Sequence, residues 1–199
     1  PNNPFLILAY KVKNNDLNNQ YLENIKNVKI KLDNLKGIKS TFSIIDAPIL
    51  LNSELSLSEL NSETIKTLES KDVDIKKALQ ELKNSPIFSD QIINKKGNVT
   101  AIIAYLKEDK EFNKISKQRS ELKKLIENNE ANSLQKDKLK IINKKYEQLK
   151  ELYNKDRHNL INEIRLIINE PIYENNIFLG GIAMIADDSL EYVKKDIIN

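Results

Sequence analysis

The chain has no cysteine, a single histidine, and only four glycines and five prolines in 199 residues. The absence of cysteine excludes a disulfide framework, a thiolate metal site and a cysteine nucleophile. With His158 as the sole histidine, a transition-metal site and Ser-His hydrolase chemistry are both disfavoured. We therefore expect a protein that is not an enzyme and that binds neither a metal nor a cofactor.

Long apolar runs and an excess of one charge are missing too. No run approaches the roughly 20 apolar residues that cross a bilayer, and Pro1-Asn-Asn-Pro4 begins no secretion signal, so we expect a piece of a longer chain. The net charge is only +3, and aromatic residues make up 6% of the chain. This composition gives no electrostatic footprint for nucleic acid, while the Ile and Leu content is sufficient for a folded core.

The first half of the chain predicts alternating strands and helices. Leu17 to Leu35 has apolar residues three and four apart, with Asp16 placed to cap this helix and Gly37 to end it in a left-handed conformation. Gly97 marks the turn of a hairpin. The remaining predicted elements are strands over 5–12, 38–45, 91–93 and 99–106 and a short helix over 74–83.

From Glu108 onward the composition changes, because residues 108–169 contain neither glycine nor proline and are dense in Lys, Glu, Leu and Ile. Two apolar seams joined by a polar loop predict an antiparallel, coiled-coil helical hairpin over 108–155. We expect the charged pair Asp156-Arg157 to interrupt the apolar seam, after which the wider apolar face of 160–168 returns to the core.

The last part predicts a buried strand over 177–185, followed by a helix that Asp188 and Glu191 begin with a capping box. Without the hairpin, the element order is that of a ferredoxin-like split β-α-β arrangement. The predicted fold class is therefore α+β. A ferredoxin-like domain comprises 1–107 and 156–199, and the helical hairpin of 108–155 is inserted into it.

Three segments resemble one family of membrane exporters. They are residues 32–48 (LDNLKGIKSTFSIIDAP), residues 97–106 (GNVTAIIAYL), and LGGIAMI of 179–185 with Asp188 and Tyr192. Together they are similar to the first extracytoplasmic loop of lipid-type exporters of the resistance-nodulation-division (RND) superfamily, the branch related to Patched and to mycobacterial large membrane proteins.

The resemblance implies the periplasmic porter domain of an inner-membrane, proton-driven exporter of hydrophobic or amphiphilic molecules such as lipids, sterols or hopanoids. Its partners would be the substrate, the transmembrane part and a second porter domain of the same chain. A further periplasmic partner could dock at the hairpin tip. The proton-relay carboxylates of the family lie in transmembrane helices, so no residue here inherits that role.

A leucine-rich connection after the second strand is the candidate substrate site. It concentrates apolar side chains without a helical or strand period, which suits the lining of a cleft for a lipid-like ligand. The simpler interpretation is that these residues close the core. The candidate ligand-binding residues are Ile49, Leu50, Leu51, Leu55 and Leu57.

Other motifs have simpler structural interpretations. We expect Asp187 and Asp188 to cap a helix rather than to act as an acid/base pair, and His158 to be solvated. Gly180-Gly181 lacks the spacing of a phosphate loop. Two alternatives to the exporter remain: a coiled-coil periplasmic adaptor, and an RNA-binding sheet, which would require more aromatic and basic strands.

Overall fold

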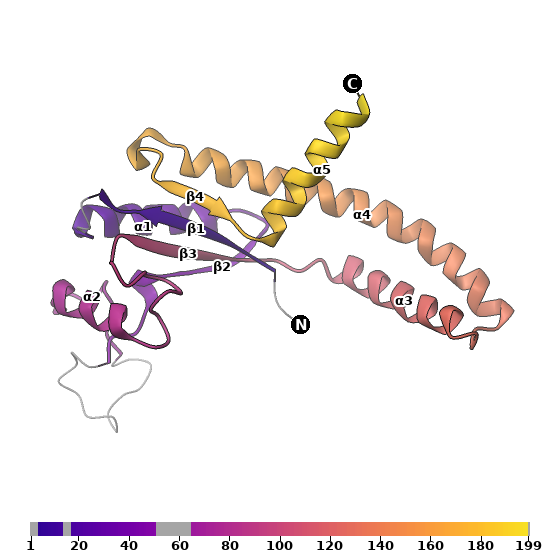
Figure 1. Cartoon of the computed structure of the whole chain (residues 1–199), viewed down its shortest axis with the longest axis horizontal. Coiled ribbons are helices and arrows are strands. Elements are labelled where there is room, and N and C mark those ends of the chain that lie inside the picture. The colour runs from indigo at the N-terminus through magenta and orange to yellow at the C-terminus, as the bar shows by residue number, and fades with distance from the viewer. Residues whose placement is uncertain (1–3, 14–16, 51–64, 199) are drawn as a thin grey trace.

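The computed structural model describes residues 4–13, 17–50 and 65–198, with the backbone alone from residue 191 on. It is a mixed α+β structure built on a four-stranded antiparallel sheet of order β2-β3-β1-β4 (Figure 1). The strands are β1 (Phe5–Lys11), β2 (Ile38–Ser43), β3 (Val99–Leu106) and β4 (Ile177–Gly180). Because β3 separates β1 from β2, and β1 separates β3 from β4, each helical crossover joins parallel strands that are not neighbours.

One face of the sheet is covered by α1 (Asn19–Asp33) and by the C-terminal third of α4 (Ser133–Ile168). Both helices contribute buried residues at helical spacing, and they contact each other as well as the sheet. The main core consists of this interface. Its members include Leu6, Leu8 and Tyr10 of β1, Ile102 and Leu106 of β3, Ile25 and Leu32 of α1, and Ile161 and Ile164 of α4.

The ends of α1 differ from the prediction. Asn18 caps the helix by accepting hydrogen bonds from the backbone N–H groups of Gln20 and Tyr21, whereas Asp16 lies outside the described residues. The helix ends at Asn34, and Gly37 does not adopt a positive φ. Gly37 is instead a point of close packing, since a Cβ there would lie 2.6 Å from Cδ2 of Leu160.

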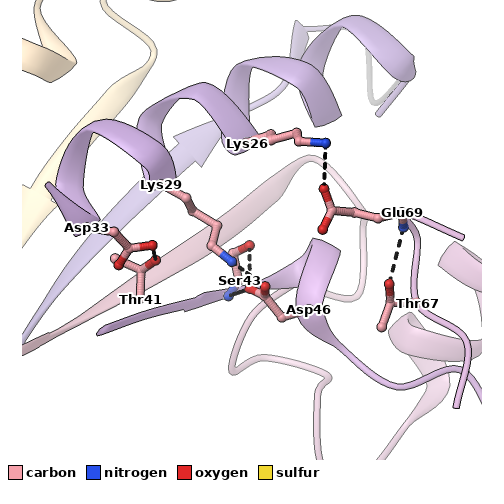
Figure 2. A network of polar contacts seen from close by, with 8 residues as sticks. All are labelled: Lys26, Lys29, Asp33, Thr41, Ser43, Asp46, Thr67 and Glu69. Carbon is pink, nitrogen blue, oxygen red and sulfur yellow. Dashed lines mark hydrogen bonds and ion pairs between the residues drawn. The ribbon is translucent and has the colours of Figure 1, made fainter. Parts of the chain in front are cut away.

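A polar network holds the chain after β2 against α1 (Figure 2). The strand ends in a short 3-10 helix, η2 (Ile44–Asp46), and the Asp46 carboxylate accepts hydrogen bonds from the Ser43 backbone N–H at 2.7 Å and from its hydroxyl at 3.1 Å. The same carboxylate pairs with the partly buried Lys29 of α1. A second ion pair of 3.0 Å joins Lys26 to Glu69, beyond the undescribed segment. These contacts hold Asp46 and Glu69, which lie on either side of the undescribed segment, close to one helix.

The region before β3 contains α2 (Ile75–Asn84), and Asp74, predicted as the first residue of this helix, is its N-cap. The predicted strand over 91–93 is wrong, because these residues form only isolated bridges, such as Ile93 with Thr100. Backbone hydrogen bonds from Gln91 and Ile92 to the Phe88 carbonyl make a turn there instead. Gly97 has a φ of 72°, as the predicted turn requires.

The helical hairpin consists of α3 (Lys110–Glu127) and α4, and it projects away from the sheet (Figure 1). Helix α4 runs without interruption for 36 residues, and Asp156-Arg157, where the apolar seam was predicted to be interrupted, lies within it. Before this pair the buried residue Ile142 packs in the hairpin cluster, and from Leu160 on the buried residues belong to the main core.

Aromatic rings fix the base of this hairpin. Phe112 stacks between Tyr146 and Tyr153, with ring centroids 5.4 Å and 4.7 Å apart. The guanidinium of Arg119 lies 4.3 Å from the Tyr146 ring centre, and that of Arg157 lies 5.2 Å from the Tyr153 ring centre. The result is a five-member stack, to which α3 contributes Phe112 and Arg119 and α4 contributes Tyr146, Tyr153 and Arg157.

The C-terminal elements also correct the prediction. The strand is only four residues long, and α5 (Ile182–Ile198) begins directly after Gly181, whose φ is 119°. Asp188 therefore lies inside the helix and does not start it. A Cβ at Gly181 would lie 3.2 Å from the Phe5 carbonyl oxygen, so the glycine allows the turn to pass close to β1.

Candidate functional site: the open face of the sheet

The two central strands, β1 and β3, carry apolar residues on both of their faces, although the described helices cover only one face. An antiparallel sheet covered on one side usually alternates apolar and polar residues, whereas continuous apolar runs are typical of strands buried on both faces. β1 and β3 have such runs, FLILAY and VTAIIAYL. Their alternate residues are buried beneath α1 and α4, and the others face outward.

The outward residues of different strands lie side by side. The register places Phe42 of β2 opposite Ile103 of β3, Ile103 opposite Ile7 of β1, and Ile7 opposite Gly180 of β4. Phe178 and Phe5 extend this row toward either end of the strands. We call Phe5, Ile7, Phe42, Ile103 and Phe178 the open sheet face.

The side chains of this face are accessible to solvent. Phe5, Ile7 and Phe178 are exposed, Phe178 to 57%, while Phe42 and Ile103 are partly buried. No acidic or basic residue belongs to the row, and Gly180, which has no side chain, is the residue opposite Ile7. A contiguous apolar surface of this kind is characteristic of an interaction site rather than of a solvated surface.

Comparisons of the chain with family models, curated proteins and solved structures find no match. What this face does must therefore be argued from its chemistry. It can bind another apolar surface by burial, but it presents no polar group that would orient a small polar substrate.

The predicted cleft residues fall in different environments. Ile49 is only 1% exposed and belongs to the core, where its backbone N–H donates to the Lys66 carbonyl at 2.9 Å. Leu50 is exposed, and its N–H donates to the Glu81 carboxylate at 2.6 Å. Leu51, Leu55 and Leu57 lie outside the described residues, and the two described members of the set face different surroundings.

A second polar site joins α4 to α5, and it corrects the interpretation of His158 and the two aspartates. Nδ1 of His158 lies 3.1 Å from Oδ2 of Asp187, whose side chain is 6% exposed, and Nε2 lies 2.9 Å from the Asn162 amide. Arg165 donates to Asp188 at 2.6 Å. The aspartates therefore do not cap a helix and the histidine is not merely solvated, because all three residues attach α5 to α4.

His158 and Asp187 are paired like the histidine and aspartate of a catalytic triad, but the contacts of this pair are structural. The hydrogen bonds of His158 in the described part of the chain go to Asp187 and Asn162, and the nearby Ser189 hydroxyl donates to the Ile185 carbonyl. Within residues 4–13, 17–50 and 65–198 there is no cluster of three or more side chains suited to hold a metal ion.

The described helices also include none that is long and apolar enough to cross a membrane. The sequence does contain the signal for the open sheet face, namely the apolar runs of β1 and β3. What the sequence alone does not provide is the knowledge that the described helices cover only one face of these strands.

Proposed function

We propose that this chain is the periplasmic porter domain of a proton-driven RND-type exporter in the inner membrane, handling hydrophobic or amphiphilic molecules such as lipids, sterols or hopanoids. In this proposal the domain is not an enzyme, carries no cofactor and binds no nucleic acid. Its partners are the substrate, the transmembrane part and a second porter domain of the same chain.

The topology supports the ferredoxin-like part of this proposal. Two β-α-β units, β1-α1-β2 and β3-α4-β4, are interleaved so that each inserts one strand between the strands of the other. This strand order is the one expected of a split β-α-β arrangement with an insertion before its second helix, which supports that part of the proposal. Because unrelated functions share this arrangement, topology alone does not carry the functional proposal.

The observation that carries the proposal is the open sheet face. Phe5, Ile7 and Phe178 are already about half buried, so covering the rest of each against a partner would contribute on the order of 1 kcal/mol per side chain, about half the value for a fully exposed one. A second domain tethered in the same chain would supply such a partner at a high effective concentration. Sliding between two apolar faces needs no exchange of fixed hydrogen bonds, which suits domains that move against each other.

A matched pair of substitutions tests this in the full-length transporter. Phe178→Asp places a charge on the open sheet face, and Ile172→Asp places one at an equally exposed side chain outside it, since both residues are 57% exposed. We expect Phe178→Asp to reduce export of a fluorescent lipid analogue at least tenfold, a loss of about 1.4 kcal/mol of productive docking, and Ile172→Asp to leave it unchanged.

Equal export by both variants at equal expression would refute the docking role of the face. A full-length reading frame without apolar spans of about 20 residues on both sides of this segment would refute the exporter itself. For the leucine-rich connection, Leu50→Asp should reduce photo-crosslinking of a lipid probe, and unchanged labelling would remove Leu50 from the site.

A second candidate is a coiled-coil periplasmic adaptor, which the length of the helical hairpin favours. An adaptor would bind its partner through the hairpin tip near Asn129 rather than through the sheet. Deletion of residues 113–150 separates the candidates, because an adaptor would lose its partner while a porter domain would keep the apolar sheet interface.

A further inference from the structure

One face of α4 carries a stripe of exposed apolar residues that neither the core nor the helical hairpin uses. Leu134, Ile141, Leu152 and Leu166 are between 59% and 77% exposed. With 3.6 residues per turn, their spacings of seven, eleven and fourteen residues place all four within a narrow arc of the helix surface. Gln148 and Asn159 complete the same line at seven-residue steps. We call these six residues the α4 seam.

The α4 seam is distinct from the two occupied faces of the helix. Ile142, about a quarter turn to one side, and Tyr146, more than a third of a turn to the same side, pack toward α3. His158 and Arg165, about a quarter turn or slightly more to the other side, hold α5. The seam thus lies between them on a face where all six of its residues are exposed, and it extends for 32 residues, or about 48 Å, from Leu134 to Leu166.

The pattern is symmetric under reversal of the helix direction. Positions equally far from residue 150 pair Leu134 with Leu166, Ile141 with Asn159, and Gln148 with Leu152. When two α4 helices run antiparallel, each of these pairs forms one layer of contact between them. Every layer then contains a leucine or isoleucine, and no layer pairs two polar residues. A parallel alignment in register would instead stack Gln148 on Gln148 and Asn159 on Asn159.

We propose that the α4 seam binds a second copy of this chain in an antiparallel, two-fold symmetric helix pair. The antiparallel partner is complementary in charge along the flank nearest α3. Lys138 would lie beside Glu163 of the second copy, and Lys145 beside Asp156, each pair occurring twice. All four side chains are exposed in the single chain, and in the described residues only Lys145 has an ion-pair partner, Glu111.

The opposite flank limits the affinity. Lys144 would lie near Lys155 of the second copy, and like charges facing each other are destabilising. The leucine layers and the four complementary pairs outweigh these two contacts. The expected dimer is weak, with a Kd on the order of micromolar. This inference does not depend on the exporter proposal, because it concerns the hairpin side of the molecule and not the sheet.

Sedimentation equilibrium of the chain gives the first test. We expect reversible dimerisation, weakened at least about tenfold by Leu152→Glu, which introduces a charge near the two-fold axis in both copies. Ile30→Glu is the matched control, because Ile30 is an exposed apolar residue on α1, away from the seam, and it should leave the Kd unchanged. A chain that stays monomeric at about 100 μM overturns the proposal and leaves the seam to a different protein.

Disulfide trapping and charge reversal test the direction of the pair, and the absence of natural cysteine makes introduced thiols unambiguous. A mixture of Leu134→Cys and Leu166→Cys chains should form the mixed disulfide, while either variant alone should not crosslink. A Leu134 homodimer would overturn the antiparallel arrangement. Lys138→Glu should weaken association, and adding Glu163→Lys to it should restore the affinity. In a parallel pair Lys138→Glu would gain nothing from Glu163→Lys, so failure of this rescue also counts against the proposal.

Discussion

Two buried tyrosines make the fold sensitive to alkali. Tyr10 is 1% exposed, and its hydroxyl oxygen accepts a hydrogen bond from the Asn24 amide at 2.9 Å. Burial raises the pKa of Tyr10 above its ordinary value of 10.0, and burial likewise raises the pKa of Tyr173, against the opposing effect of Lys31. Each tyrosine therefore keeps its proton in the folded chain at a pH where the unfolded chain has begun to lose it.

The sign of the effect follows from proton linkage. Above about pH 10 the unfolded chain binds fewer protons than the folded chain, so the free energy of unfolding falls as the pH rises. One tyrosine contributes a slope of at most about 1.4 kcal/mol per pH unit to the free energy of unfolding. Two tyrosines together contribute at most about 2.7 kcal/mol per pH unit. This stabilisation is complete below pH 10 and is lost as the pH rises through the raised pKa values.

Urea unfolding followed by circular dichroism between about pH 9 and about pH 11 measures this slope. The double variant Tyr10→Phe/Tyr173→Phe should be less stable at neutral pH, by about 1–3 kcal/mol at Tyr10, because the buried Asn24 amide loses its acceptor. Its alkaline slope should nevertheless be smaller than that of the natural chain. An unchanged slope in the double variant would refute the assignment to these two residues.

Three further substitutions test other parts of the fold. Phe112→Ala should lower stability by about 2–4 kcal/mol, because it removes two ring stacks and their buried area, and thermal unfolding measures the loss; a loss below about 0.5 kcal/mol would show that the stack is not formed. Asp187→Asn should increase hydrogen exchange in α5 without unfolding the sheet, since it weakens the contact with α4, and unchanged α5 protection would contradict this. Gly37→Ala should cost about 1–3 kcal/mol in chemical denaturation by displacing Leu160. Gly180→Ala, whose Cβ would lie 3.9 Å from the nearest backbone oxygen, should have little effect, and equal losses at both glycines would contradict the packing argument.

The sequence predicted the parts of the fold that local patterns determine. The first three strands of the sheet, α1, α2 and the hairpin follow the predicted ranges, because apolar periodicity, Asp74 and the turn at Gly97 act over short distances. Residues 177–185 were predicted as one strand and form a strand followed by a helix. A short apolar run such as IAMI fits either state, and the left-handed turn at Gly181 beside Phe5 decides between them.

The candidate sites depended more strongly on tertiary contacts. Asp188 and Glu191 have capping-box spacing, yet the contact of Arg165 with Asp188 arises only when α5 packs on α4. Ile49 belonged to an apolar run with no helical or strand period. The sequence therefore did not show whether Ile49 is buried in the core, as it is beside Lys66, or lines a cleft. The apolar composition of β1 and β3 signalled the open sheet face in the sequence. Whether that face is exposed depends on where the helices pack, which the sequence of the strands does not show.

The continuity of α4 has a mechanical consequence. The same helix is embedded in the core at Leu160 and reaches the end of the hairpin at Ser133, 27 residues or about 40 Å away, with no break between them. It therefore behaves as a lever whose fulcrum is the sheet. A tilt of only about 5° at the fulcrum moves the far end by about 3–4 Å, and a force applied to the far end is delivered as torque to β1 and β4.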